Sequence, residues 1–478
     1  MTTRTRHLFP LAVAALLSWG ALAFGSEYSW AYAPLLVFAL VVAALGLLGS
    51  RGVRFPAPAI GVALAAIVAG VLLQLAPLPQ RVIRAVSPAS VAEDYALLYA
   101  KATMQPVEAS PPSAGEAFRP VSIAPSRTAL GLTFLVVLIV LFVWGTRGIS
   151  AIGPLGIARS VLFLGLVVAL LELAQRASGS AVIYGFWYPP QLKGYHSAPF
   201  VNRNHTAGWL LMALALSVGS LAGVLANGLR EAKPDWRHRV LWLSSRHGSE
   251  ALLTGFAVAA MAISIVATAS RSGSVCLALV ILMFGWWVAR RQLSRSRKAF
   301  AFGYLVVVAL AALSFGGMEI LAGRLHQTSW SDLDGRVHLW KDTARIIQDF
   351  PWTGTGWNTY GIAMLRYQTL QDGSQYIEAH NDYVQVASEG GLLVTIPIAI
   401  TLLLFIREVR RRFQEGDDHA RTYWLRVGAV TGLCAIAAQA TLDFTLQMPG
   451  AAVLFVVLAA IAIHRPSPVH GSDVHHSH

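Results

Sequence analysis

Residues 128–145 read TALGLTFLVVLIVLFVWG, a run that holds no charged residue. A helix of this length and apolarity is long enough to cross the hydrocarbon core of a bilayer, which is about 30 Å thick. Similar runs recur from one end of the 478-residue chain to the other. The sequence therefore predicts an all-α polytopic membrane protein with about twelve transmembrane helices.

The predicted helices are apolar runs of roughly 17–25 residues. Their approximate bounds are 8–25, 31–49, 57–76, 128–145, 154–174, 205–227, 250–269, 273–289, 300–322, 388–406, 425–443 and 450–464. We expect the first run to remain as a helix. A cleaved signal peptide is the alternative, because Arg4 and Arg6 precede the run and Ala21-Leu22-Ala23 ends it.

The composition supports a membrane protein and argues against a nucleic-acid-binding one. Hydrophobic residues make up 55% of the chain and charged residues 13%, about half the charged share of soluble domains. The mean hydropathy is +0.56. The net charge of +13 comes from short basic clusters between the apolar runs, as orientation signals do, so we expect no nucleic-acid partner.

The basic clusters set the predicted orientation. They lie at 51–54, 230–246, 290–298 and 407–412, each after an even-numbered apolar run. Because Lys and Arg stay on the cytoplasmic side, both termini are predicted to be cytoplasmic. The long loops 77–127, 175–204 and 323–387 are then predicted to face outward, away from the cytoplasm.

The chain divides into three predicted parts. Residues 1–127 hold three transmembrane helices and a Pro/Ala-rich outward loop, 128–465 form the transmembrane core, and 466–478 form a polar, His-rich cytoplasmic tail. The core includes the large outward loop 323–387. Part of that loop is predicted to be helical, with Val337, Trp340, Ala344 and Ile347 on one face and Pro351 after its end.

Polar and charged residues, which are unfavourable in the hydrocarbon core of a membrane, lie at the outward ends of three predicted helices. Those helices run inward, so their N-termini offer unpaired N–H groups and a partial positive charge on the outer face. Asn204, Ser270 and Asn381 are good capping residues, and Arg203 and Arg271 add full charges. If the three ends converge, they form a site for a phosphate or diphosphate. The alternative is ordinary capping with interfacial arginines.

Other acidic residues do not predict a metal site. Asp332-Leu333-Asp334 resembles a metal-binding carboxylate pair, but two carboxylates alone make a weak site, and Asp334 is well placed to cap a helix beginning near Gly335. Glu172 is an isolated acid within a predicted transmembrane helix, to be paired or protonated. We therefore predict neither a metal nor a cofactor.

Several motifs together resemble the O-antigen ligase/polymerase superfamily of bacterial envelope proteins. The matching segments are Pro199-Phe200-Val201-Asn202-Arg203-Asn204-His205-Thr206-Ala207-Gly208, Ser270-Arg271-Ser272-Gly273, Arg336, Leu339-Trp340, Phe350-Pro351, Gly354, Gly356, His380-Asn381-Asp382-Tyr383, Glu389 and Gly391. The resemblance spans about residues 190–400. It departs at Val394, where the family often has a second glycine, which affects helix packing more than chemistry.

The resemblance implies a metal-independent glycosyltransferase with a GT-C-like helical bundle and a large, partly helical periplasmic loop. The donor would be a glycan on undecaprenyl diphosphate, and membrane lipid would surround the protein. In ligases the acceptor is the lipid A–core sugar of lipopolysaccharide, and in polymerases it is another growing glycan. In related oligosaccharyltransferases it is a protein hydroxyl. The sequence does not distinguish among these acceptors.

The chemistry of such a transfer assigns roles to the clustered residues. Histidine titrates near neutral pH, so His380 is the predicted general base for the acceptor hydroxyl, with His205 as the competing histidine. Arg203 and Arg271 are predicted to bind the leaving diphosphate, since a guanidinium is a planar, permanently charged donor.

The remaining residues of these clusters are predicted to support the reaction. Asn202, Asn204, His205 and Ser270 would shape the donor site, Asn381 and Glu389 would hold His380, and Arg336 would contact donor or acceptor. Two rival functions remain, a transporter of lipid-linked glycans and a scaffold protein. A transporter places its charges near the bilayer midplane, whereas here they gather at outward ends.

Overall fold

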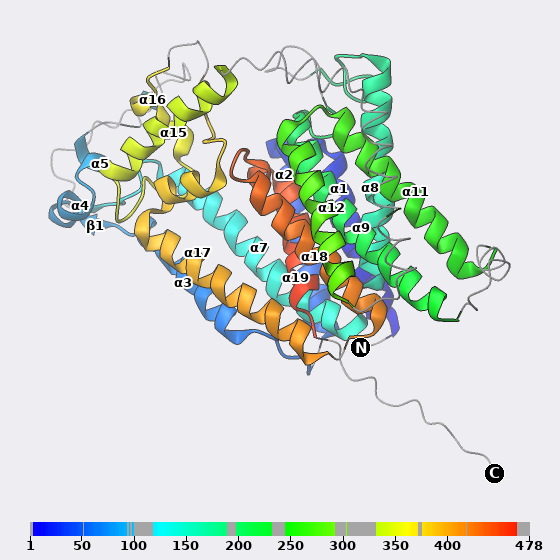
Figure 1. Ribbon diagram of the computed structural model, residues 1–478. Helices are drawn as coiled ribbons and strands as arrows, with labels where there is room; N and C mark the ends of the chain where they lie inside the picture. Colours follow the sequence, from blue (N-terminus) through cyan, green and yellow to red (C-terminus); the bar gives the residue numbers. More distant parts are fainter. Residues whose placement is uncertain are drawn as a thin grey trace.

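The computed structural model describes residues 3–50, 52–92, 95, 98–99, 118–188, 197–231, 244–291, 303, 331–370, 375–416 and 418–465. Its long helices form an elongated bundle (Figure 1). They are α1 (Thr3–Leu22), α2 (Ser29–Gly49), α3 (Pro58–Leu75), α7 (Pro125–Ile152), α8 (Leu155–Ser178), α9 (Arg203–Glu231), α11 (Arg246–Ala267), α12 (Arg271–Arg290), α17 (Asp382–Glu415), α18 (Ala420–Gln439) and α19 (Pro449–Ile463).

Short elements connect or cover these helices. They are η1 (Phe24–Ser26), β1 (Leu78–Pro79), α4 (Gln80–Val86), α5 (Ala89–Ala92), β2 (Phe118–Arg119), α15 (Ser331–Asp349), α16 (Tyr360–Tyr367) and η2 (Thr445–Gln447). The two strands pair antiparallel, with Leu78 opposite Arg119. They close the base of the predicted outward loop 77–127.

The chain is a polytopic membrane protein. Within the described residues, eight helices are long and apolar enough to cross a membrane, namely α2, α3, α7, α8, the 203–227 part of α9, α11, α12 and α17. Two shorter apolar helices, His7–Leu22 and Pro449–Ile463, lie in α1 and α19. Every predicted span except 300–322 overlaps a helix, and that span lies outside the described residues apart from Gly303.

The core lies around α9. Trp209, Leu210, Leu211 and Met212 are successive residues with no exposed surface, so α9 is apolar and buried all round. It packs on α18, α11 and α8. By contrast, outer helices expose large apolar side chains such as Leu403 at 67%, which is the distribution expected where lipid is the solvent.

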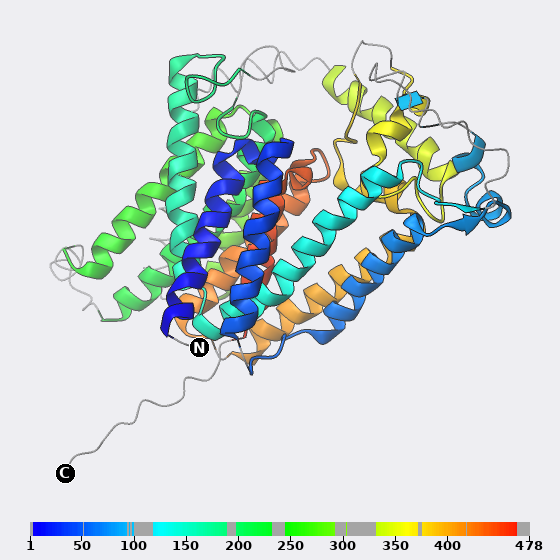
Figure 2. The same cartoon turned by 180° about the vertical axis from the view of Figure 1, so that it is seen from behind.

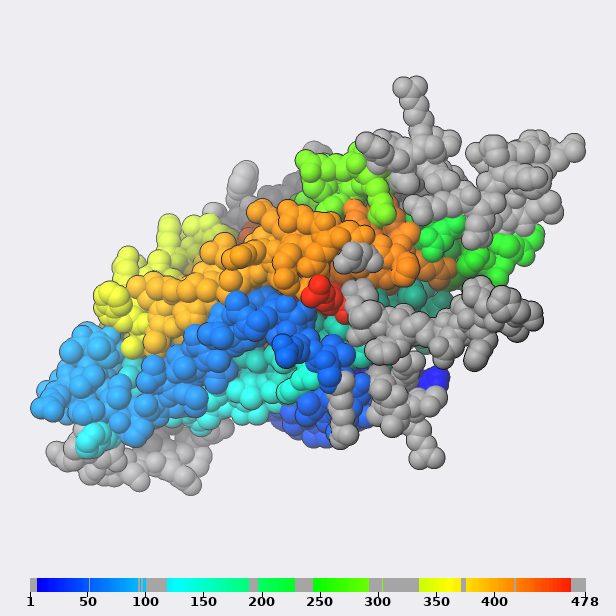
Figure 3. Space-filling model, turned by 90° about the horizontal axis from the view of Figure 1, so that it is seen from below, coloured from blue at the N-terminus to red at the C-terminus, as the bar shows by residue number. Residues whose placement is uncertain are grey.

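The directions in which the helices run show at which end of the bundle the predicted site lies. α1 begins and α19 ends at the same end of the bundle, and the N-termini of α9 and α12 lie at the opposite end (Figure 1). Seen from behind, α4, α5, α15 and α16 gather at that opposite end, beside the start of α17 (Figure 2). Below them α3 lies along α17 (Figure 3).

The buried face of α15 differs from the predicted one. Val337 is 40% exposed and Ala344 is exposed, whereas Leu339, Thr343 and Ile346 are buried. The prediction was wrong because polar side chains occupy the buried face: Thr343 Oγ1 lies 2.8 Å from the Tyr360 hydroxyl. Polar side chains can be buried when they are hydrogen-bonded, and a search for apolar periodicity does not find a face that contains them.

Candidate active site at converging helix N-termini

The three predicted helix N-termini meet at one end of the bundle. The Ser270 hydroxyl, at the start of α12, donates a 2.8 Å hydrogen bond to Asn204 Oδ1 in the first turn of α9. The backbone N–H of Asp382, the first residue of α17, donates to the Ala440 carbonyl at 2.9 Å. The Gln439 amide donates to the Asn204 carbonyl at 3.0 Å, so the end of α18 joins the same group.

Side chains cap each of the three ends. Ser270 accepts from the Gly273 N–H at 3.2 Å, and Asn381 accepts from the Tyr383 and Val384 N–H groups at 3.1 and 3.2 Å. At α9 the residue before the first helical position is Asn202, whose Oδ1 accepts from the Asn204 N–H at 2.9 Å. Asn202 is therefore the cap of α9, and the side chain of Asn204 instead joins α9 to α12.

A strained residue precedes each capping residue. Val201, Ala269 and His380 have φ of +62°, +55° and +51°. Residues other than glycine rarely adopt this left-handed region, and such strain concentrates at functional sites. The same local geometry thus occurs three times around one point, which goes beyond what capping alone requires.

Two arginines lie at these ends. Arg203 and Arg271 are the first residues of α9 and α12, and both are exposed. Each side chain starts at the positive end of a helix dipole. Full and partial positive charges that meet in this way suit an anion with several oxygens.

His380 faces this group from the loop before α17. It is half-buried, and its ring centre lies 4.7 Å from that of Phe444, nearly perpendicular to it. Burial, and then the charge of Arg336, lower the pKa of His380 to about 4. The imidazole is therefore neutral at neutral pH and can accept a proton. The backbone of the preceding residue is fixed, because Trp340 Nε1 donates to the Ala379 carbonyl at 3.0 Å.

His205 packs on the same phenylalanine. Its ring centre is also 4.7 Å from that of Phe444, but His205 is only 2% exposed. Its Nε2 lies 3.8 Å from Asp443 Oδ1. The two histidines share one neighbour, yet only His380 is open enough to meet a substrate.

Asp443 is the site residue that the sequence analysis missed. It lies in the turn 440–448 between α18 and α19 and has no exposed surface. Burial raises its pKa to about 6, opposed by the Phe444 N–H and by the charge of Arg336, among others. The predicted span 425–443 extends into this turn, whereas α18 ends at Gln439. An acid at the outward end of a span was the available signal.

Arg336 and Glu389 occupy different places relative to His380. The charge of Arg336, on α15, lowers the pKa of both His380 and Asp443. Glu389 is 4% exposed and accepts from the N–H groups of Asn358 and Tyr360 at 2.9 and 3.0 Å. These bonds hold the loop before α16, and they do not involve the imidazole of His380.

Glu172, which the sequence left without a partner, has one in the fold. It has no exposed surface and accepts from the Ser197 hydroxyl at 2.7 Å and the Ala198 N–H at 2.9 Å. It thereby holds the segment that leads into Asn202 and Arg203. The acid is structural support for the start of α9.

A buried glutamine fixes the break in α17. The helix breaks at Gly391, with φ +53° and ψ −165°, where the 351–357 loop packs against it. Gln74, from α3, donates to the carbonyls of Thr353 and Glu389 at 2.6 and 2.8 Å and accepts from the Trp357 N–H at 3.0 Å. One side chain thus positions both the loop and the α17 segment that follows His380.

Gln74→Leu is expected to destabilise the protein by about 3 kcal/mol, because it leaves two carbonyls and one N–H buried without partners. Thermal unfolding of the detergent-solubilised protein measures the effect. Gln348→Leu, at an exposed position of α15, is the control and should unfold at the wild-type temperature. An unchanged unfolding temperature for Gln74→Leu would contradict the assigned role.

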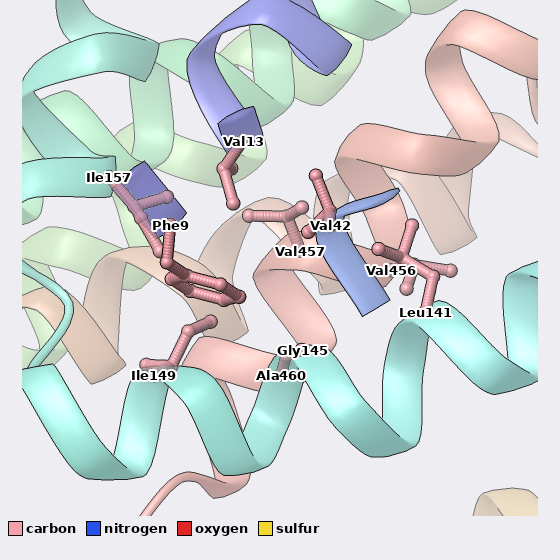
Figure 4. Close-up of a pocket in the computed structure, with 10 residues that line it drawn as sticks. All are labelled: Phe9, Val13, Val42, Leu141, Gly145, Ile149, Ile157, Val456, Val457 and Ala460. Atoms are coloured by element: carbon pink, nitrogen blue, oxygen red, sulfur yellow. The ribbon is translucent and has the colours of Figure 1, made fainter. Parts of the chain in front are cut away.

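An apolar pocket elsewhere in the bundle does not offer this chemistry. It lies between α1, α2, α7, α8 and α19, and apolar side chains such as Phe9, Val13 and Leu141 line it (Figure 4). Its lining provides neither charge nor hydrogen-bonding side chains. This pocket therefore does not suit a charged ligand.

Comparison with known proteins identifies one domain. A family model described as O-antigen ligase matches residues 256–399. The matched region contains Arg271, Arg336 and His380, whereas Arg203 lies before it. Among curated proteins nothing matches. Residues 256–399 are thus an O-antigen ligase domain, carried by a polytopic membrane protein.

Proposed function

We propose that this protein is a glycosyltransferase that moves a glycan from undecaprenyl diphosphate to an acceptor hydroxyl on the outer face of the bacterial inner membrane. The favoured acceptor is the lipid A–core sugar, as in O-antigen ligases. The observation that carries the proposal is the meeting of three helix N-termini, two arginines and a neutral histidine at one end of the bundle. The O-antigen ligase domain supports it.

The proposed reaction is a direct displacement at the first sugar of the donor. The acceptor oxygen bonds to the anomeric carbon while the bond from that carbon to the diphosphate oxygen breaks. His380 accepts the hydroxyl proton, and the electron pair leaves with the diphosphate. Arg203, Arg271 and the N-termini of α9 and α12 stabilise the added negative charge. These cations take the part that a divalent metal plays in other transferases, so the proposed reaction is metal-independent and inverting.

The proposed topology has about twelve transmembrane helices with both termini in the cytoplasm. Three facts support it: the eight long apolar helices, the shorter ones in α1 and α19, and the shared end of α1 and α19. The converging N-termini then face the periplasm, where a lipid-linked donor and the outward loops meet. Labelling of single cysteines with a membrane-impermeant reagent, at Ser29 and at His419, tests the orientation.

Purified protein with a synthetic undecaprenyl-diphosphate glycan and rough lipopolysaccharide tests the function. Glycan transfer to the lipid A–core, in the presence of EDTA, is the expected result. Extension of the carrier-linked glycan alone would identify a polymerase instead. Movement of intact donor across vesicles without transfer would identify a transporter.

The pH profile should depend on Arg336. His380 must be unprotonated to act as a base, and its pKa is lowered to about 4, so kcat/KM should fall only as the pH falls through about 4. Arg336→Met removes one of the two causes of that lowered pKa. The acidic limb should therefore move to higher pH while staying below the ordinary histidine value near 6.5.

Two comparisons make this pH experiment specific. Arg345→Met, on the same helix but paired with Asp342 at 3.3 Å, should leave the acidic limb in place. Arg336 also affects Asp443, so the pH profiles with and without Arg336→Met are measured again in an Asp443→Asn background. An acidic limb that Arg336→Met leaves unmoved in both backgrounds would exclude His380 as the titrating base.

A further inference from the structure

A cluster of aromatic side chains lies beside the site and has no part in the reaction described so far. We call it the aromatic platform; its members, from η1, the start of α2 and the segment after α8, are Phe24, Tyr28, Trp30, Tyr184, Phe186 and Trp187. Phe24 is its centre, with ring distances of 5.0 Å to Trp187 and 5.5 Å to Tyr184. Tyr28 and Trp30 are nearly parallel, at 6°.

The aromatic platform has a buried centre and an open rim. Phe24 is only 5% exposed, whereas Phe186 is 74% and Trp30 is 48% exposed. Rings that are fixed by their neighbours and still exposed are suited to stack on a ligand, because binding then orders few side chains.

Residues of the aromatic platform and its neighbour Ser26 have the same left-handed backbone as the residues that precede the three helix caps. Phe24, Ser26 and Tyr184 have φ of +56°, +57° and +57°. Anchoring in the membrane interface needs aromatic residues but no strained backbone. Strain of this kind persists where the fold holds side chains in a required geometry, as at ligand-binding sites.

The aromatic platform borders the reacting groups. Phe200, three residues before Arg203, packs so closely on η1 that a Cβ at Gly25 would lie 2.6 Å from its ring. η1 also packs on the start of α19, where a Cβ at Gly450 would lie 3.0 Å from the Gly25 carbonyl oxygen. The turn just before α19 carries Phe444, whose ring centre lies 4.7 Å from that of His380. The aromatic platform and Glu27, next to η1, thus lie at the end of the bundle that carries the base.

The chemistry of these neighbours fits a sugar better than a phospholipid. A pyranose ring presents an apolar C–H face that stacks on aromatic rings and a rim of hydroxyls that donate to carboxylates. Exposed Glu27 provides such an acceptor, while it would repel a lipid phosphate. We propose that the aromatic platform and Glu27 bind the acceptor sugar and present its hydroxyl to His380. This inference rests on the proposed transfer reaction. The acceptor is assigned here because the platform borders the base, whereas the donor diphosphate belongs to the arginines.

Photocrosslinking in intact cells tests which molecule contacts the aromatic platform. Trp30 is replaced by p-benzoylphenylalanine, and a matched control carries the same replacement at Trp286, which is also 48% exposed but lies towards the other end of the bundle on α12. The expected result is a glycan-bearing adduct at position 30 and only phospholipid adducts at position 286. Phospholipid adducts alone at position 30, or glycan adducts at both, would overturn the inference.

Kinetics on purified protein separate this inference from the proposed function. Phe186→Ala should raise the KM for rough lipopolysaccharide about tenfold and leave the KM for the donor unchanged. Phe163→Ala, 69% exposed on α8, is the matched control and should change neither constant. If the wild-type protein transfers no glycan, the proposed function fails. If it does transfer and Phe186→Ala keeps the wild-type acceptor KM, the aromatic platform is not the acceptor site.

Discussion

His380→Ala is expected to lower the kcat of glycan transfer by a factor of about 10²–10⁴, the usual contribution of a general base. The imidazole is half-buried, is held by a left-handed backbone and is neutral at neutral pH. Without it, the acceptor oxygen must attack while it still carries its proton. Donor binding depends on other residues, so the KM for the donor should change little. Single-turnover transfer with purified variants measures both.

Two other histidines make this experiment decisive. His338→Ala, at an exposed position on α15 close to the site, should retain wild-type activity. His205→Ala removes a ring that is only 2% exposed, so the expected loss is smaller and accompanied by a lower unfolding temperature. Full activity of His380→Ala, or a larger loss of kcat in His205→Ala, would reassign the base.

The sequence predicted the long helices well because transmembrane helices are decided locally. A run such as 128–145 must be helical in lipid whatever surrounds it, since its backbone has no other hydrogen-bond partners there. The ends of runs are not decided in this way. The turn 440–448 begins with residues as apolar as the end of α18, so the span 425–443 was drawn through it and Asp443 was overlooked.

The candidate site was predictable in its parts but not in its connections. Arg203, Arg271 and His380 are recognisable because charged or polar residues at the ends of apolar runs need a reason. The contacts of Gln74, however, join residues 279 to 315 positions apart in the chain. No local pattern encodes such a contact. The same holds for Phe444, whose contacts with two histidines are visible only in three dimensions.

Arg203→Ala and Arg271→Ala are each expected to reduce kcat/KM for the donor by a factor of about 10²–10³, as for loss of one donor that stabilises a developing anion. The two guanidiniums start at adjoining helix N-termini that a 2.8 Å hydrogen bond between Ser270 and Asn204 ties together, so we expect both to reach the same anion. Lysine should restore only part of the activity, because an ammonium group cannot form the paired hydrogen bonds of a guanidinium. Steady-state kinetics with a synthetic undecaprenyl-diphosphate glycan measure the loss.

The chain contains its own control for the local motif. Ser245-Arg246 begins α11 just as Ser270-Arg271 begins α12, and the Gly248 N–H donates to the Ser245 hydroxyl at 3.2 Å as Gly273 does to Ser270. Because α11 and α12 are antiparallel around a short turn, Arg246 lies at the opposite end of the bundle. Arg246→Ala should therefore keep full use of the donor. An equal loss in Arg246→Ala would mean that the Ser-Arg motif stabilises a helix start rather than a diphosphate. A loss confined to Arg203 and Arg271 would tie donor use to the end of the bundle where His380 lies.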